Sequence, residues 1–315
     1  MKTILLLFAL TLGLIAPQKR PTSSPYAWQQ LTPKAAFPGA YSFDLFATTT
    51  YAFHPEGIWR SADGRNWEKT PLPNVLGNLA FADYIQFNGN MYALGTATGN
   101  IETYHQTSRI SKTSDFKTWT TLAEKSALPK LIFYKTAVFK NKIWLMGGFD
   151  GKHHTNEVWN STNGVHWNQV TPHAAWSARN PGGLVVFQNR IYLLGGGEID
   201  KSNFNDVWSS ENGVDWQLET ARMHPTSFWG YKPVVFDGQL WLLGCNRSGD
   251  FTSEVLRSAD GKTWRAERAA WSPRGAVAAS VFKNDLLLTG GKFSVNVGGE
   301  LQFDSRNDVW QLSKN

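Results

Sequence analysis

Basic and aromatic side chains recur in the polar stretches that separate the short apolar runs of this sequence. An arginine can bind a carboxylate through two parallel hydrogen bonds, an indole can cover a sugar ring, and a histidine exchanges protons near neutral pH. This chemistry suits an acidic or a neutral sugar, or a protein partner. The residues that could supply it are His153, His154, His173, Arg179, Arg222, His224, Trp229, Arg247, Trp271 and Arg274.

Part of this set is repeated, which favours a structural role for that part. The string Ala-Ala-Trp-Ser-x-Arg occurs at Ala174–Arg179 and again at Ala269–Arg274. Its arginines could pair with acids of the repeat such as Asp206 and Asp308, and its tryptophans could pack between repeat units. The non-repeated residues are the better binding candidates: His153, His154, Arg222, His224, Trp229 and Arg247.

We expect neither a metal nor a cofactor. His153 and His154 are adjacent, so their side chains need not converge, and no His/Cys cluster has ligand spacing. The Gly-Gly pairs end apolar runs and open no helix, so they do not resemble a phosphate-binding loop. An acid/base pair could come from Glu198 or Asp200 with His173 or His224, but no spacing brings these residues together.

These residues flank a short unit that recurs along the chain. Asn163-Gly164 and Asp260-Gly261 are dipeptides typical of a two-residue type I′ hairpin turn, and Val and Trp on either side suit strands. In the fifth copy Asp115-Phe116 replaces this dipeptide, which predicts a looser turn. The copies are Val158–Trp167, Val207–Trp216, Val255–Trp264, Ile58–Trp67 and the worn Ile110–Trp119.

Two further apolar runs precede each hairpin, for example TAVF before Lys140 and KIWLMGG at Lys142–Gly148. Each unit therefore holds four short strands, here called a to d, within about 48 residues, a period typical of β-propeller blades. The chain is all-β, and its last copy stops after strand c. We expect Tyr26–Leu31 to supply the missing strand d and to close the ring. The six predicted blades are 40–70, 79–122, 131–171, 182–220, 230–268, and 275–312 with 26–31.

The Gly147-Gly148 pair after strand b, the sequence Asn156–Trp159 at strand c and the later Trp167 resemble kelch repeats. The resemblance implies a kelch-type propeller, a family that includes sugar-active enzymes, such as galactose oxidases and sialic acid mutarotases, and binding scaffolds without activity. A copper-radical oxidase needs a tyrosine cross-linked to a cysteine, together with further Tyr and His ligands. It is not expected here, because the only candidate, Cys245, lies at the exit of a strand b. Ser61–Trp67 is similar to the Asp-box of sialidases, which implies a structural turn.

In such a fold the b–c and d–a loops open on one face, and the a–b and c–d turns open on the other. The candidate residues fall in long b–c and d–a loops, such as 149–156 and 221–230, whereas the other turns are short. Loops on a rigid scaffold commonly carry function. The sequence thus favours a non-catalytic scaffold that binds a ligand or partner on this face. The alternative is a sugar-active enzyme such as a mutarotase or epimerase.

The N-terminal segment, the single cysteine and the net charge predict where the protein resides and what it does not bind. Met1–Ala16 is one lysine and then an apolar run, typical of a secretory signal, so 1–24 is a predicted leader and linker and 25–315 the propeller. A single cysteine excludes an intrachain disulfide, and we expect an exported monomer in the periplasm or outside the cell. Net charge falls from +6 to +3 without Lys2, Lys19 and Arg20, too little to predict nucleic-acid binding. No second apolar stretch could span a membrane after leader removal.

Overall fold

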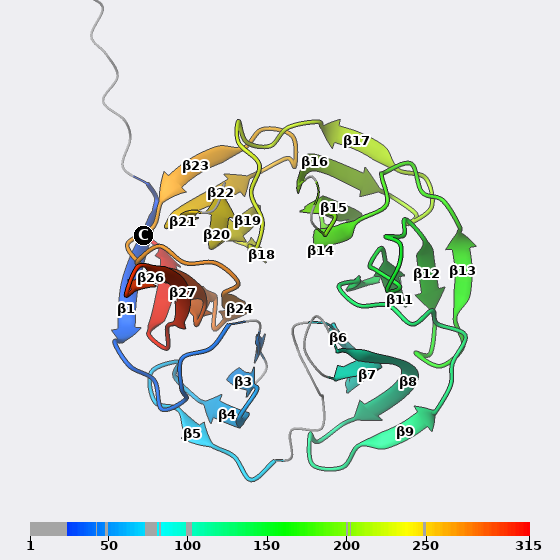
Figure 1. Cartoon of the computed structure of the whole chain (residues 1–315), viewed down its shortest axis with the longest axis horizontal. Helices are drawn as coiled ribbons and strands as arrows, with labels where there is room; N and C mark the ends of the chain where they lie inside the picture. The colour runs from blue at the N-terminus through cyan, green and yellow to red at the C-terminus, as the bar shows by residue number, and fades with distance from the viewer. Residues whose placement is uncertain are drawn as a thin grey trace, which may run out of the picture.

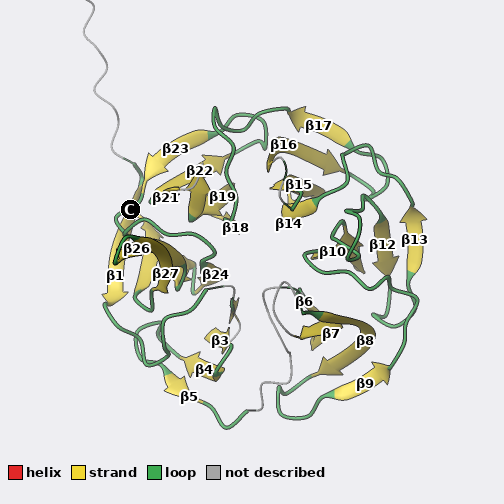
Figure 2. Cartoon of the chain, in the orientation of Figure 1, coloured by secondary structure: helices red, strands yellow, loops and turns green. Residues whose placement is uncertain are grey.

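Six antiparallel sheets of four strands form a ring around a central axis (Figure 1). The computed structural model describes residues 24–41, 43–47, 50–72, 81, 83–98, 103–199, 201, 203–247 and 250–315. The predicted leader lies almost entirely outside these residues. Within the described chain the elements are strands (Figure 2), and no helix is long and apolar enough to cross a membrane.

The sheets are the predicted blades. In spatial order, beginning with the innermost strand, they are β2 (Asp44–Ala47), β3 (Thr50–His54), β4 (Gly57–Ser61) and β5 (Glu68–Lys69); β6 (Tyr84–Phe87), β7 (Asn90–Thr98), β8 (His105–Thr113) and β9 (Thr120–Ala123); β10 (Lys135–Phe139), β11 (Lys142–Met146), β12 (Val158–Ser161) and β13 (Asn168–Thr171); β14 (Asn180–Phe187), β15 (Arg190–Gly197), β16 (Asn203–Ser210) and β17 (Gln217–Thr220); β18 (Lys232–Phe236), β19 (Gln239–Leu243), β22 (Glu254–Ser258) and β23 (Arg265–Arg268); and β24 (Ala278–Phe282), β25 (Asp285–Thr289), β28 (Val309–Lys314) and β1 (Tyr26–Thr32). Two extra hairpins, β20 (Cys245–Arg247) with β21 (Asp250–Thr252) and β26 (Lys292–Val297) with β27 (Glu300–Ser305), lie in the b–c loops of the fifth and sixth blades.

The N-terminal strand closes the ring, as predicted. β1 pairs with β28 in antiparallel register, with Trp28 opposite Leu312, and the amide of Asn315 donates a hydrogen bond of 2.8 Å to the carbonyl of Pro25. The sixth blade is therefore assembled from both ends of the chain. This pairing covers the edge of β28 that would otherwise be open.

The turn chemistry differs from the prediction. In the five blades where the structure describes it, the a–b turn is type I′, with positive φ at both central residues, as at Lys140 (48°) and Asn141 (54°). In the c–d loop only Gly164 has positive φ, so the type I′ prediction for Asn163-Gly164 was wrong. That loop is instead held by side chains. The Gly164 amide donates to Ser161 Oγ (2.8 Å), and the amides that follow Asn163 donate to its Oδ1.

The same side-chain network forms in the worn copy. The Phe116 amide donates to Thr113 Oγ1 (2.8 Å), and two amides donate to Asp115 Oδ1 (2.9 Å each), so the looser turn predicted there is not found. Phe116 takes the positive φ (59°) that glycine has in the other copies. Its ring packs 5.2 Å from both Tyr51 and Phe53 of the first blade.

The apolar core lies in layers between neighbouring blades. Trp144 on β11, for example, belongs to one buried cluster with Trp176 of the following d–a loop and Leu193 of the next blade. Trp176 and Trp271 are almost completely buried, which confirms the predicted packing role of the repeated tryptophans. Each blade is thus stabilised mainly through its neighbours, as expected for a ring of repeats.

Candidate functional site

The two repeated arginines are fully buried and bind acids next to the Val-Trp pair of strand c: Asp206 within β16 and Asp308 directly before β28. Arg179 forms a two-pronged ion pair with Asp206 (Nη2–Oδ2 3.0 Å), and its guanidinium lies 3.7 Å over the ring of Phe204. Arg274 binds Asp308 in the same way (Nη2–Oδ2 2.9 Å). The predicted pairing is confirmed. Burial alone would raise the pKa of Asp308, but the hydrogen bonds and charge of Arg274 hold this pKa below its usual value.

Arg247 makes the corresponding ion pair in the fifth blade from a different loop. Its guanidinium binds both carboxylate oxygens of Glu254, and its Nη1 lies 3.1 Å from Nε2 of His224. The Thr226 amide donates to Nδ1 of His224 (3.1 Å), while Nε2 lies 3.3 Å from Glu254. Arg222, by contrast, is exposed.

The remaining histidines do not converge. The side chain of His153 is 81% exposed, whereas that of His154 is 8% exposed and accepts a hydrogen bond from the Ile199 amide (3.2 Å). Burial lowers the pKa of His154. His173 is exposed, with Nδ1 3.4 Å from Asn156 Oδ1. No group of three or more metal-binding side chains occurs within the residues that the structure describes. Asp200 lies outside them.

Trp229 is different, because its ring is exposed at a point where four loops meet. Its backbone pairs with Asn246 of β20 through two hydrogen bonds (3.1 and 2.9 Å). The ammonium of Lys292 on β26 lies 5.6 Å from its ring, 4.8 Å from that of Tyr41 and 4.5 Å from that of Phe303. We call Tyr41, Trp229, Lys292, Leu301 and Phe303 the platform.

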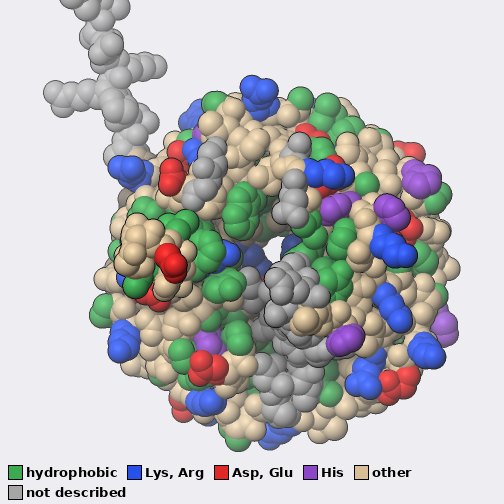
Figure 3. All heavy atoms as spheres, in the orientation of Figure 1, with side chains coloured by type: hydrophobic (Ala, Val, Ile, Leu, Met, Phe, Trp, Pro, Cys, Tyr) green, Lys and Arg blue, Asp and Glu red, His purple; other side chains and the backbone are tan. Residues whose placement is uncertain are grey.

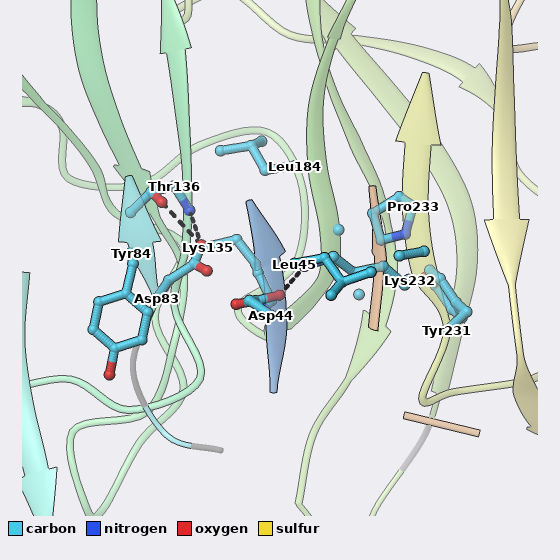
Figure 4. Close-up of a pocket in the computed structure, with 13 residues that line it drawn as sticks. Asp44, Leu45, Asp83, Tyr84, Lys135, Thr136, Leu184, Tyr231, Lys232 and Pro233 are labelled. Carbon is cyan, nitrogen blue, oxygen red and sulfur yellow. Dashed lines mark hydrogen bonds and ion pairs between the residues drawn. The ribbon is translucent and has the colours of Figure 1, made fainter. Parts of the chain in front are cut away.

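A second candidate site lies on the axis of the ring. A cavity of about 200 Å³ is lined by the innermost strands, and Figure 4 shows Asp44, Asp83, Lys135 and Lys232 around it. Lys232 forms an ion pair with Asp44, which joins the fifth blade to the first across the channel. Asp83 accepts hydrogen bonds from the amide (2.7 Å) and hydroxyl (2.9 Å) of Thr136.

Comparison with known proteins defines the family. Residues 7–257 match the family model described as the DUF6242 beta propeller domain. The chain belongs to this family. No curated protein matches significantly. A solved structure titled "Structure of YjhT" is similar to the DUF6242 propeller, with a TM-score of 0.68 and 16% sequence identity, over 87% of this chain and 96% of that one. At this identity the likeness shows the fold alone.

Sequence reasoning missed the axial charges of the DUF6242 propeller, although a signal was present. Asp83, Lys135 and Lys232 each stand four residues before the phenylalanine that ends an innermost strand, and Gly183 and Ala278 hold the same place in two other blades. Asp44 begins β2 in the first blade. A repeat position that alternates between acid, lysine and small residue while its neighbours stay apolar marks a shared polar axis.

The axial ion pair predicts how stability depends on pH. Burial would raise the pKa of Asp44, but the charges of Lys232 and Lys135 hold it below its usual value. The stability that Asp44 adds is therefore complete above the unfolded-state pKa of about 3.9 and is lost as pH falls toward the lowered folded-state pKa. We expect Asp44→Asn to lose roughly 1–2 kcal/mol of unfolding free energy at neutral pH, since both side chains keep some exposure.

Urea unfolding across the acid range measures this effect. Below about pH 4 the wild-type free energy of unfolding should fall more steeply than that of Asp44→Asn. Glu300→Gln, at the exposed tip of the β26–β27 hairpin, is the control and should follow the wild type. Parallel profiles for Asp44→Asn and wild type would show that the pair adds nothing.

Proposed function

We propose that this propeller is an exported scaffold that binds a ligand or partner, without catalysis, through the face formed by its b–c and d–a loops. One observation carries the proposal. Of the seven large apolar side chains exposed in the described chain, five belong to loops of this face: Tyr41, Trp229, Val297, Leu301 and Phe303. The face drawn in Figure 3 carries apolar side chains around the β26–β27 hairpin. An apolar patch left open to water is typical of an interaction site.

The arrangement of the titratable groups supports binding over catalysis. His154 lies with Glu198 near the fourth blade, whereas His224 lies with Arg247 and Glu254 near the fifth. Neither histidine lines the axial cavity. A sugar mutarotase or epimerase needs a proton donor and a proton acceptor that both lie within hydrogen-bond reach of one bound sugar. Each of the two histidine–carboxylate contacts instead joins two neighbouring loops, and the two contacts lie in different blades.

Export and the kelch type of the blades are part of the same proposal. The apolar run within Met1–Ala16 and the single buried thiol of Cys245 suit a protein that leaves the cytoplasm and resides in a periplasm or outside the cell. The Gly147-Gly148 pair supports kelch-type blades, because both glycines have positive φ (61° and 109°) and a Cβ on Gly148 would lie 2.9 Å from the carbonyl oxygen of Ile132.

Paired surface variants test the proposed face. A thermal-shift screen of 25–315 against acidic and neutral sugars, and a pull-down from envelope extract, would supply binders. A ligand at about 100 times its Kd adds roughly 2.7 kcal/mol of stability. Leu301→Ser/Phe303→Ser, or Arg222→Ala/His224→Ala, should remove that gain. The matched control Val214→Ser/Leu218→Ser, away from these loops, should keep it. Binding that survives both loop variants and is lost in the control would overturn the proposal.

A further inference from the structure

Lys292 is a cation enclosed by aromatic rings and left without an anion. Its ammonium lies within 6 Å of the rings of Tyr41, Trp229 and Phe303, as cation–π contacts require. In the described chain no carboxylate forms an ion pair with it. Burial lowers the pKa of Lys292, and no neighbouring acid raises it again. This ammonium is therefore available to a negative charge from another molecule.

The acids of the same hairpin do not supply that charge. Lys292 lies opposite Ser305, and Ser294 lies opposite Phe303, so these pairs share one face of the ribbon. Asp304 pairs with Phe293 and Glu300 with Val297, which places both acids on the other face. Arg306 lies 4.0 Å over Phe293 on that side. One face of the ribbon therefore carries Lys292 with Leu301 and Phe303, and both acids lie on the opposite face.

Backbone hydrogen bonds hold the platform in place. Gly275 and Lys292 exchange two hydrogen bonds (2.9 and 2.8 Å), and Trp229 and Asn246 exchange another two (3.1 and 2.9 Å). The Ala276 amide donates to the carbonyl of Gly230 (2.6 Å), which ties the two d–a loops together. Phe251 packs edge-on against Phe303, with ring centres 6.1 Å apart. The rings are therefore fixed before a partner arrives, which lowers the entropy cost of binding.

The outer edge of β27 is open for pairing. A two-residue turn at Gly298-Gly299 makes Val297 and Glu300 a hydrogen-bonded pair, so the backbone groups of Leu301 and Phe303 point away from β26. The sheet has two strands, and in the described chain no backbone group bonds to these two residues from the outside. The side chains of Leu301 and Phe303 are 68% and 57% exposed. Unpaired groups and uncovered apolar side chains thus lie on one strand.

We infer that β27 accepts an extended segment of a partner protein, which adds a third strand to the hairpin and places an acidic side chain against Lys292. This inference rests on the proposed function and names the partner class. Strand addition satisfies the open backbone groups, apolar side chains of the segment cover Leu301 and Phe303, and its carboxylate completes the cation's surroundings. An acidic sugar would serve Lys292 but would leave the strand edge unpaired and the Leu301 side chain in water.

Short random peptides displayed on phage, panned on the purified 25–315 propeller, test the inference. The enriched peptides should combine one Asp or Glu with aliphatic or aromatic residues. The synthetic consensus peptide should lose about tenfold or more in affinity to Lys292→Met, while Lys292→Arg keeps most of it. Methylating every second backbone nitrogen of the peptide should abolish binding in one register and spare it in the other, because only alternate amides face β27.

Other outcomes are equally informative. The inference would be overturned by peptides that still bind after methylation in either register, or by peptides whose affinity is unchanged by Lys292→Met. If their binding is lost in Arg222→Ala/His224→Ala, the binding face still stands and only the strand-addition site is wrong. Failure to enrich peptides, with polygalacturonate binding that depends on Lys292, would assign the platform to acidic sugars and overturn the inference. Sedimentation that shows a dimer lost in Leu301→Ser/Phe303→Ser would assign the edge to a second copy of the chain and also overturn it.

Discussion

A chain that begins at Lys34 will not fold on its own. It lacks β1, so β28 keeps an open edge and the side chains of Tyr26, Trp28 and Leu31 leave the core. Burial of each contributes about 1.5–3 kcal/mol, so the loss of roughly 4.5–9 kcal/mol is comparable to the whole stability of an ordinary domain. Circular dichroism and size-exclusion chromatography should show an unfolded or aggregated chain.

A synthetic strand separates ring closure from a general effect of truncation. The peptide 24–33, added during refolding, should restore the folded propeller because it can pair with β28 as β1 does. The same peptide with Trp28→Asp and Leu31→Asp should fail, since it would bury two carboxylates in the core. If the truncated chain alone melts cooperatively near the wild-type temperature, ring closure by β1 adds little to stability.

Replacing Arg274 by Ala should lower the free energy of unfolding by about 3–5 kcal/mol, because it leaves the mostly buried carboxylate of Asp308 without its partner. Arg274 also donates to the carbonyls of Ser272 and Gly290, which would lose a donor. Urea unfolding measures the change. Arg222→Ala, at an exposed arginine of an equivalent loop, should change stability by no more than about 0.5 kcal/mol.

A double variant distinguishes a buried ion pair from a packing effect. Arg274→Met with Asp308→Leu removes both charges and keeps much of the volume, so it should be more stable than Arg274→Ala alone. If the double variant is the less stable of the two, the arginine acts mainly through its hydrogen bonds to backbone carbonyls and through Ser272 Oγ (2.8 Å).

The blades could be predicted from the sequence because each repeat contains its own apolar strand segments and turn residues. The predicted ends at 171, 220 and 268 are the ends of β13, β17 and β23. Turn types could not be predicted from the dipeptides alone. Asn163-Gly164 satisfies the rule for a type I′ turn, but Ser161 Oγ and Asn163 Oδ1 offer the loop amides closer acceptors than a hairpin ladder does. Local side-chain hydrogen bonds therefore determine the conformation of this loop.

The candidate site could be predicted only where its parts were repeated or shared a loop. The pairing of Arg179 and Arg274 with acids followed from repetition. Trp229 was among the candidates, but Lys292, Tyr41 and Phe303 were not, because Tyr41, Trp229 and the β26–β27 hairpin come from distant parts of the chain. Tyr41 reaches Lys292 only when the N-terminal segment closes the ring. The surroundings of Lys292 form only in the closed ring, so no local sequence pattern predicts them.

The residues around the axis also bear on how such a chain can arise. When a ring grows by duplication of one repeat, all copies of the innermost position meet at a common centre. In this chain Asp44, Asp83, Lys135 and Lys232 are four of those copies. Identical copies there would gather like charges in a narrow cavity, where their repulsion is strong. The outer strands and the c–d loops can keep the same sequence in every blade, because each makes the same contacts with its neighbours all around the ring. A charged innermost position does not, so after duplication we expect it to diverge between blades, as the acids, lysines and small residues found there have done.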